Sequence, residues 1–141
     1  MEQIDIRSRA QALYVKNLEM KALVAPYAVK ENLQTSIDFE IRARPLDING
    51  HWSIVAQIAV QAHSASGDVY FSSSVELEQI YALEPVPEDK RIDVIKNSLA
   101  AYVFGHARAT LATITVNSGY GPVHIPPISA NVLASRVIVN E

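Results

Sequence analysis

Alternating apolar and polar positions predict four β-strands in the first part of the chain. Successive side chains of a strand point to opposite faces, so a strand packed on one side buries every second residue. The alternation is clearest in the second predicted strand, whose apolar face carries Ile37, Phe39, Ile41 and Ala43. The four predicted strands cover residues 12–22, 36–44, 52–63 and 69–83.

The segments between these strands carry turn signals. Residues 23–34 interrupt the alternation with Pro26 and end in polar residues, which predicts a crossing loop with an apolar first half. Asn49 and Gly50 tolerate positive φ and predict a hairpin between the second and third strands. The fourth strand changes phase near residues 72–74, where we expect a bulge or bend.

A helical period follows the fourth predicted strand. Apolar residues recur at steps of three or four and predict one helix of about seven turns; they are Ile92, Ile95, Leu99, Val103, Ala107, Leu111 and Ile114. Pro87 suits the first helical position, and Gly119 suits the helix end. Residues 113–116 also alternate like a strand, which remains an alternative there. Small residues are expected on the second side of the helix: Ala100, Ala101, Gly105, Ala109 and Ala112.

These elements predict an α+β fold in a single domain of residues 1–141. The expected architecture is a four-stranded antiparallel sheet, a meander with a crossover loop, packed on one long helix. Residues 121–133 are rich in proline and apolar residues and should form an extended cover, whereas residues 132–139 fit either a further strand or a short helix. One sheet face needs water or a partner, so we expect an oligomer.

Composition narrows the function classes. The chain has 141 residues, of which 49% are hydrophobic, and a formal net charge of −3. It has no basic stripe for nucleic acid or anionic membranes. Without cysteine it has no disulfide or thiolate site, as fits a cytoplasmic protein. The N-terminus lacks the features of a signal peptide, so we expect the mature chain to be the whole chain.

No constellation of residues predicts catalysis. The four histidines lack the spacing of zinc ligands, and the run at residues 72–74 lacks a nucleophile elbow. Acid pairs such as Asp38 with Glu40 are ordinary on a solvated strand face. We therefore expect no enzyme, no metal site and no cofactor. The unusual feature is surplus apolar surface, which either closes one core or binds a partner.

Six collinear segments resemble the SecB family of export chaperones. They are "LYVKNLEMKALVAPYAV", "SIDFEIRA", "SIVAQIAVQA", "VYFSSSVELEQIYAL", "FGHARATLATI" and "HIPPISANVL". The resemblance implies a cytoplasmic, ATP-independent holdase that binds unfolded or non-native polypeptides in apolar grooves, assembled as a dimer of dimers. Carried onto matching positions, it implies these client-binding residues: Pro26, Tyr27, Ile37, Phe39, Ile41, Leu111, Ile114, Val123 and Ile125.

The resemblance is weaker where the family engages the SecA motor. Acidic positions of the family are matched here by Asn17, Lys21 and Ser74, and little follows that matches the family's last helix and acidic tail. Coupling to SecA is therefore doubtful, and an antitoxin is an alternative partner. Two other classes stay open from the residues alone: a hotdog-like small-ligand carrier or thioesterase, and a purely structural interaction module.

Overall fold

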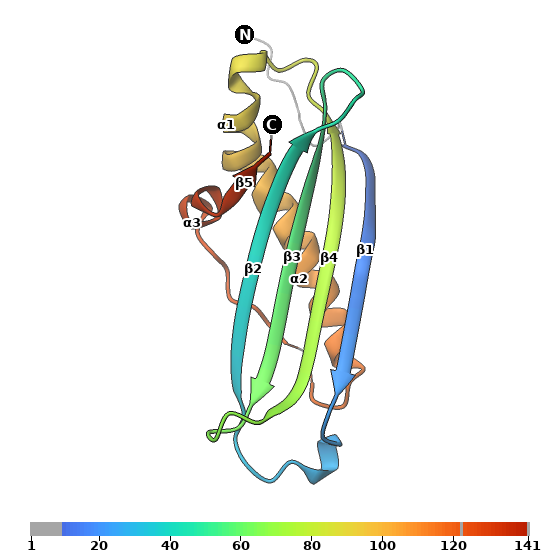
Figure 1. Cartoon of the computed structure of the whole chain (residues 1–141), viewed down its shortest axis with the longest axis vertical. Coiled ribbons are helices and arrows are strands. Elements are labelled where there is room, and N and C mark those ends of the chain that lie inside the picture. The colour runs from blue at the N-terminus through green and yellow to red at the C-terminus, as the bar shows by residue number, and fades with distance from the viewer. Residues whose placement is uncertain (1–9, 122, 141) are drawn as a thin grey trace.

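One long helix crosses one face of a five-stranded sheet (Figure 1). The computed structural model describes residues 10–121 and 123–140. The strands are β1 (Ala10–Ala22), β2 (Gln34–Pro45), β3 (His51–His63), β4 (Val69–Ala82) and β5 (Val137–Val139). Their order across the sheet is β1-β4-β3-β2-β5. The four predicted strands are confirmed, with ends shifted by one or two residues.

The fifth strand corrects the predicted fold class. β5 pairs in parallel with Ile41, Arg42 and Ala43 of β2, so the sheet is mixed rather than purely antiparallel. A short helix, α3 (Ala130–Ser135), precedes it, and both alternatives considered for residues 132–139 therefore occur in succession. Three β-branched residues give too short a local signal for a strand. Their partner also lies far away in the sequence, where no local pattern can reveal it.

The irregularity predicted for β4 occurs, but it lies nearer the start of the strand than residues 72–74. Residues 72–74 pair regularly with β1 and β3, but Phe71 pairs with Ala62 whereas Val69 pairs with His63, which leaves Tyr70 as an extra residue of β4. The β1–β4 pair also shifts register, on the β1 side, between Ala10 and Ala12 and between Val15 and Asn17. After this shift β4 keeps one phase, because its odd-numbered residues from Phe71 to Tyr81 are all buried. The apparent change of phase arises because Ile80 is apolar but shares the opposite face with Glu78.

The predicted long helix is confirmed, with an irregularity that the sequence did not indicate. A 3-10 turn (Glu88–Lys90) leads into α1 (Arg91–Val94), a π-helical turn (Ile95–Leu99) and α2 (Ala100–Val116). The residues at the junctions after α1 keep right-handed helical dihedrals, so the backbone is continuous. Residues 113–116 are helical, and the strand alternative for them is wrong. Gly119 follows at φ +88°, which a side chain would strain.

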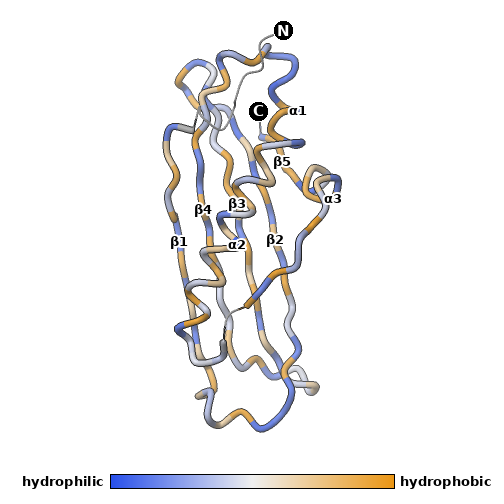
Figure 2. The backbone as a smooth tube through the Cα atoms, turned by 180° about the vertical axis from the view of Figure 1, so that it is seen from behind, coloured by the Kyte–Doolittle hydropathy of each residue, from blue (hydrophilic) through white to orange (hydrophobic). Residues whose placement is uncertain are grey.

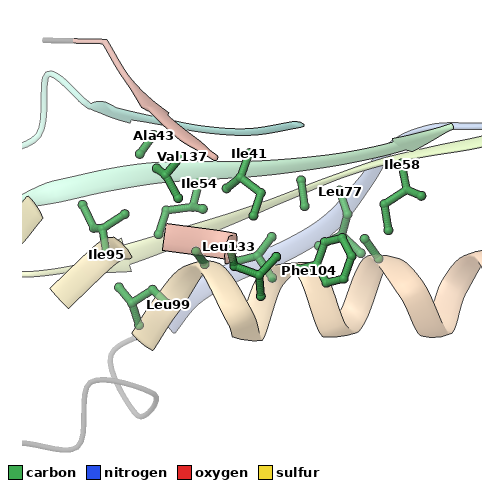
Figure 3. Close-up of a cluster of buried hydrophobic side chains, with 14 of the residues drawn as sticks. Ile41, Ala43, Ile54, Ile58, Leu77, Ile95, Leu99, Phe104, Leu133 and Val137 are labelled. Atoms are coloured by element: carbon green, nitrogen blue, oxygen red, sulfur yellow. The ribbon is translucent and has the colours of Figure 1, made fainter. Parts of the chain in front are cut away.

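The core lies between the helix and the sheet face that it covers, here called the inner face (Figure 3). Leu77 of the sheet and Phe104 of the helix point into this layer, Ile54 lies nearer Ile95 and Leu99, and Leu133 of α3 and Val137 of β5 belong to the same cluster. Seen from behind, α2 runs obliquely from the β2 side toward β1 (Figure 2). Among the described residues, no helix is both long and apolar enough to span a bilayer.

The small residues of the helix lie only partly on its second side, which faces away from the sheet. Ala101 and Ala109 are exposed, and Gly105 and Ala112 are half-buried. Ala100 is completely buried, so its expected position was wrong. It lies one turn before Val103 and Phe104 and therefore faces the sheet with them.

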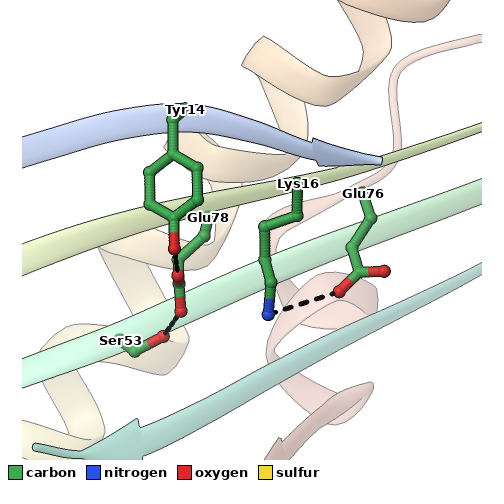
Figure 4. A network of polar contacts seen from close by, with 5 residues as sticks. All are labelled: Tyr14, Lys16, Ser53, Glu76 and Glu78. Atoms are coloured by element: carbon green, nitrogen blue, oxygen red, sulfur yellow. Dashed lines mark hydrogen bonds and ion pairs between the residues drawn. The ribbon is translucent and has the colours of Figure 1, made fainter. Parts of the chain in front are cut away.

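The opposite, outer face of the sheet is polar and holds a buried carboxylate (Figure 4). Glu78 is 4% exposed and accepts hydrogen bonds from the hydroxyls of Tyr14 on β1 and Ser53 on β3. Lys16 approaches Glu76 at 3.7 Å beside it. Glu78 thus links three strands, and burial raises the pKa of its carboxyl.

This raised pKa predicts a pH dependence of stability. A carboxyl with a higher pKa in the folded than in the unfolded chain favours folding most below its ordinary value of 4.5 and loses that contribution as pH rises through the folded value. The unfolding free energy of the wild type, measured against that of Glu78→Gln by urea titration, should therefore rise as pH falls from 7 toward 4. If the unfolding free energies of the two proteins change in parallel with pH, the pKa of Glu78 is not raised by folding.

Candidate functional site

Three of the predicted binding residues belong to the core. Ile41 and Leu111 are completely buried, and Ile125 is 5% exposed. Ile41 lies on the sheet face under the helix, Leu111 is a residue of the helix itself, and Ile125 packs into the same cluster. The prediction that they face a client is corrected for this conformation: the proline-rich segment holds Ile125 against the core rather than away from it.

Phe39 lies at an open cavity on the β2 side of the molecule. Its half-buried ring packs on Phe104, with ring centroids 5.1 Å apart, while the guanidinium of Arg136 lies 4.5 Å from its centroid. We call this the β2 cavity. It measures about 460 Å³ and is lined by Asp38, Phe39, Glu40, Ser135, Arg136 and Ile138. Sequence analysis identified Phe39 but missed Arg136, which reaches the site only through the pairing of β5.

Ile37 continues the apolar face of β2 away from this cavity and is 39% exposed. β5 pairs only with residues 41–43 of β2, so no described strand covers the edge of β2 from Gln34 to Glu40. Apolar side chains and an uncovered strand edge therefore occur together at this end of the sheet.

Ile114 lies on the other side of the helix, in a second cavity. This β1 cavity measures about 320 Å³ and is lined by Leu18, His106, Ala109, Thr110, Thr113, Ile114 and Asn117. Leu18 on the inner face of β1 is 42% exposed because α2 does not cover that strand fully. The alternation of β1 predicts the direction of Leu18, but only the tertiary fold brings it to Ile114.

The crossover loop and the segment after α2 are fastened to each other. Tyr120 donates its hydroxyl to the carbonyl oxygen of Val24, and its ring stacks on Phe71 with centroids 4.6 Å apart. A side chain at Gly119 would come within 2.9 Å of Pro26, so these backbones approach closely. Of the predicted loop residues, Pro26 is half-buried at this junction, whereas Tyr27 is 92% exposed.

Val123 is half-buried and is positioned by a buried hydroxyl. Its N–H donates to Oγ1 of Thr115 at 2.8 Å, and the same hydroxyl donates to the carbonyl of Leu111 at 2.9 Å. Thr115 therefore connects the last turns of α2 to the beginning of the proline-rich segment.

Removing the Tyr120 hydroxyl should loosen the crossover loop. Tyr120→Phe leaves the carbonyl of Val24 without its donor, at an expected cost of about 0.5–1.5 kcal/mol in the unfolding free energy. The amides of Ala28 and Val29, which close the 3-10 turn Pro26–Ala28, should exchange several-fold faster in hydrogen-exchange NMR. Tyr27→Phe is the matched control, because its exposed ring should leave both quantities unchanged. If these two amides exchange equally fast in both variants, the Tyr120 hydroxyl does not hold the crossover loop.

The described residues offer no metal site: no group of three or more His, Cys, Asp or Glu side chains comes together among them. Ser36 Oγ and His63 Nε2 lie 2.8 Å apart on the outer face. Nδ1 of that histidine faces the carbonyl oxygen of Ser64 at 3.3 Å instead of a carboxylate. We interpret this contact as a cross-strand hydrogen bond.

Known proteins resemble this chain over most of its length. The family model described as preprotein translocase subunit SecB matches residues 2–136. Protein-export protein SecB of Acidovorax sp. (strain JS42) is 25% identical over 123 residues, which cover 84% of this chain and 79% of that protein. The protein of the same name from Psychrobacter arcticus is 23% identical over 129 residues, which cover 91% and 86%.

A solved structure agrees with the fold. The SecB-like chaperone of Mycobacterium tuberculosis, in complex with a ChAD peptide from the HigA1 antitoxin, superimposes with a TM-score of 0.67 at 13% identity. The match covers 87% of this chain and 93% of that chain. At this identity the likeness supports the SecB-like fold, and the peptide is a property of that protein.

Proposed function

The chain belongs to the SecB family of export chaperones, and we propose that it acts in the cytoplasm as an ATP-independent holdase for non-native polypeptides. The observation that carries this proposal is incompletely covered apolar surface on both sides of the long helix. Phe39 and Ile37 lie on the β2 side, and Ile114 and Leu18 on the β1 side. Apolar surface of this kind, bordered by polar residues, is typical of sites that bind other chains.

The energetics suit weak and sequence-tolerant binding. Burying roughly 100 Å² of client side chain in one cavity contributes about 2–3 kcal/mol at about 25 cal/mol per Å². One such contact is short-lived. Several contacts along one unfolded chain raise the overall affinity by orders of magnitude, because each bound segment holds the next one nearby. Folded proteins lack long exposed apolar segments and are left free.

We also propose a homo-oligomer, with a dimer of dimers as the expected state. The inner face of β1 leaves Leu13 and Val15 each 44% exposed, and Tyr102 on the outside of the helix is 36% exposed. A second copy of the chain would cover these side chains. Sedimentation or light scattering of the purified protein measures the assembly directly.

The outer face of β1 bears on the partner to which clients would be delivered. Lys21 on β1 is paired with Glu19 at 2.8 Å, and Asn17 lies on the same outer face, where the resemblance places acidic residues. A docking surface for SecA would thus lack part of its negative charge. We therefore propose that SecA coupling is weak and that another partner, such as an antitoxin, is a candidate.

The openness of the β2 and β1 cavities argues against either of them being the site of a small-ligand carrier. Each of the two cavities is bounded by only a few side chains at the margin of the helix, whereas an acyl-binding enzyme encloses its ligand.

The holdase proposal is tested with a client that aggregates on dilution from denaturant. Light scattering of that client should be suppressed by an equimolar amount of this protein, without ATP. Bovine serum albumin at the same mass concentration controls for non-specific crowding. Undiminished scattering at a several-fold molar excess of the chaperone would reject the proposal.

A further inference from the structure

We propose that residues 136–139 occupy a client site of their own chain and act as a built-in pseudo-client. In this proposal, a client strand with a basic residue followed by β-branched residues replaces them at the edge of β2. The inference rests on the proposed holdase function and names the kind of segment that one of its sites recognises.

The first argument is the set of contacts made by Arg136. Its guanidinium lies over the ring of Phe39 at 4.5 Å, and Nη2 donates to the carbonyl oxygen of Phe39 at 3.1 Å. Nη2 is also 3.8 Å from the carboxylate of Asp38. An aromatic face, a carbonyl and a carboxylate together form a receptor for a cation. Nevertheless, the Arg136 side chain remains 48% exposed, so the receptor is accessible from solvent.

The second argument is the register of the strand that follows. Val137 pairs with Ile41, Ile138 with Arg42 and Val139 with Ala43, all in parallel. Val137 is 8% exposed on the inner face, whereas Ile138 is 42% exposed on the outer face. The segment therefore lies as an added edge strand should: main-chain pairing holds it, and alternate side chains enter the core.

The third argument is that this strand is held by few interactions. β5 pairs through three residues, and the N–H of Asn140 adds one further bond to the carbonyl of Ala43 at 2.9 Å. α3 before it is six residues long. An incoming strand of similar chemistry can continue along the uncovered edge from Gln34 to Glu40 and gain pairing that β5 does not have.

The charges around the site define the ligand. Glu40 is paired with Arg42 at 2.9 Å, whereas the carboxylate of Asp38, whose side chain is 89% exposed, is paired only with Arg136 among the ion pairs of the described residues. A lysine or arginine of the client fits beside Asp38 and over Phe39. An acidic residue in the same place would meet repulsion from Asp38 and lose the aromatic contact.

The test uses the full chain and the fluorescein-labelled peptide Arg-Val-Ile-Val-Asn as a probe. Arg136→Glu places a negative charge next to Asp38 and should release residues 136–139. The dissociation constant of the probe should then fall about tenfold relative to wild type, as expected for the loss of one charge-assisted contact. Arg136→Lys keeps a cation and should stay within about threefold of wild type. The peptide Glu-Val-Ile-Val-Asn should bind much more weakly to all three proteins.

A second measurement needs no variant. In wild type, a permanently unfolded client, reduced and carboxymethylated α-lactalbumin, should speed the hydrogen exchange of the Asn140 amide. If this client binds but neither the exchange nor the probe affinity changes, the pseudo-client inference is wrong and the holdase function stands. If the client binds to none of the proteins, the holdase function itself fails, and the inference fails with it.

Discussion

Substituting Phe39 by aspartate should abolish the capture of unfolded clients at the β2 cavity. Phe39→Asp removes the ring that forms the apolar wall of this cavity and adds a negative charge next to Asp38 and Glu40. Losing the burial of one aromatic side chain costs about 1.5–3 kcal/mol per contact, and a desolvated charge adds to it. Since avidity multiplies this loss over several sites, client affinity should fall by at least about a hundredfold. Fluorescence anisotropy of a labelled, carboxymethylated α-lactalbumin measures the change.

The fold should survive this substitution, because Phe39 is half-buried and Arg136 can pair with the new carboxylate. Phe39→Leu is the matched control, since it keeps an apolar side chain and should retain most of the affinity. Circular dichroism and oligomer mass should match the wild type in both variants. A client affinity that is unchanged in Phe39→Asp would remove the β2 cavity from the proposed binding surface.

Truncating Leu111 should act on stability instead of on binding. Leu111 is completely buried between helix and sheet, and Leu111→Ala should lower the unfolding free energy by about 2–5 kcal/mol through lost burial and a residual cavity. A loss of this size is a large part of the stability of a domain. Urea unfolding measures it, and client affinity below the transition should remain near that of the wild type.

Val116→Ala provides the matched control on the same helix. Val116 is 51% exposed, so its truncation should change the unfolding free energy by less than about 0.5 kcal/mol. Should Leu111→Ala leave stability unchanged and weaken client binding, Leu111 would instead belong to the binding surface that the resemblance implied.

The sequence predicted the elements of the inner layer well, because their signals are local. Alternation over nine or more residues identified β2 and β3, and repeated steps of three or four identified the helix. β5 and the β1–β4 register shifts escaped prediction because they depend on pairing between distant segments. A strand of three residues carries too little pattern of its own.

For the candidate site, the sequence predicted which face of a strand each side chain lies on, but not how deeply that side chain is buried. Ile37, Phe39 and Ile41 share one face of β2, yet they are exposed, half-buried and fully buried in that order. The alternation gives their common direction. Their depth depends on where the oblique helix and α3 pass over the strand, which is a property of the tertiary fold. Arg136 could not be assigned to the site for the same reason.

The π-helical turn has a consequence for the spacing of the helix. Buried positions from Ile95 to Thr115 recur every fourth residue, whereas an α-helix turns once in 3.6 residues. The wider turn at residues 95–99 absorbs part of this mismatch. Deleting one residue there would restore an ordinary ladder of hydrogen bonds but rotate everything after it by about 100° relative to α1. Phe104 would then face water. The irregular turn therefore keeps the partly buried apolar residues of α1 and the buried residues of α2 on the same side of the helix, facing the sheet.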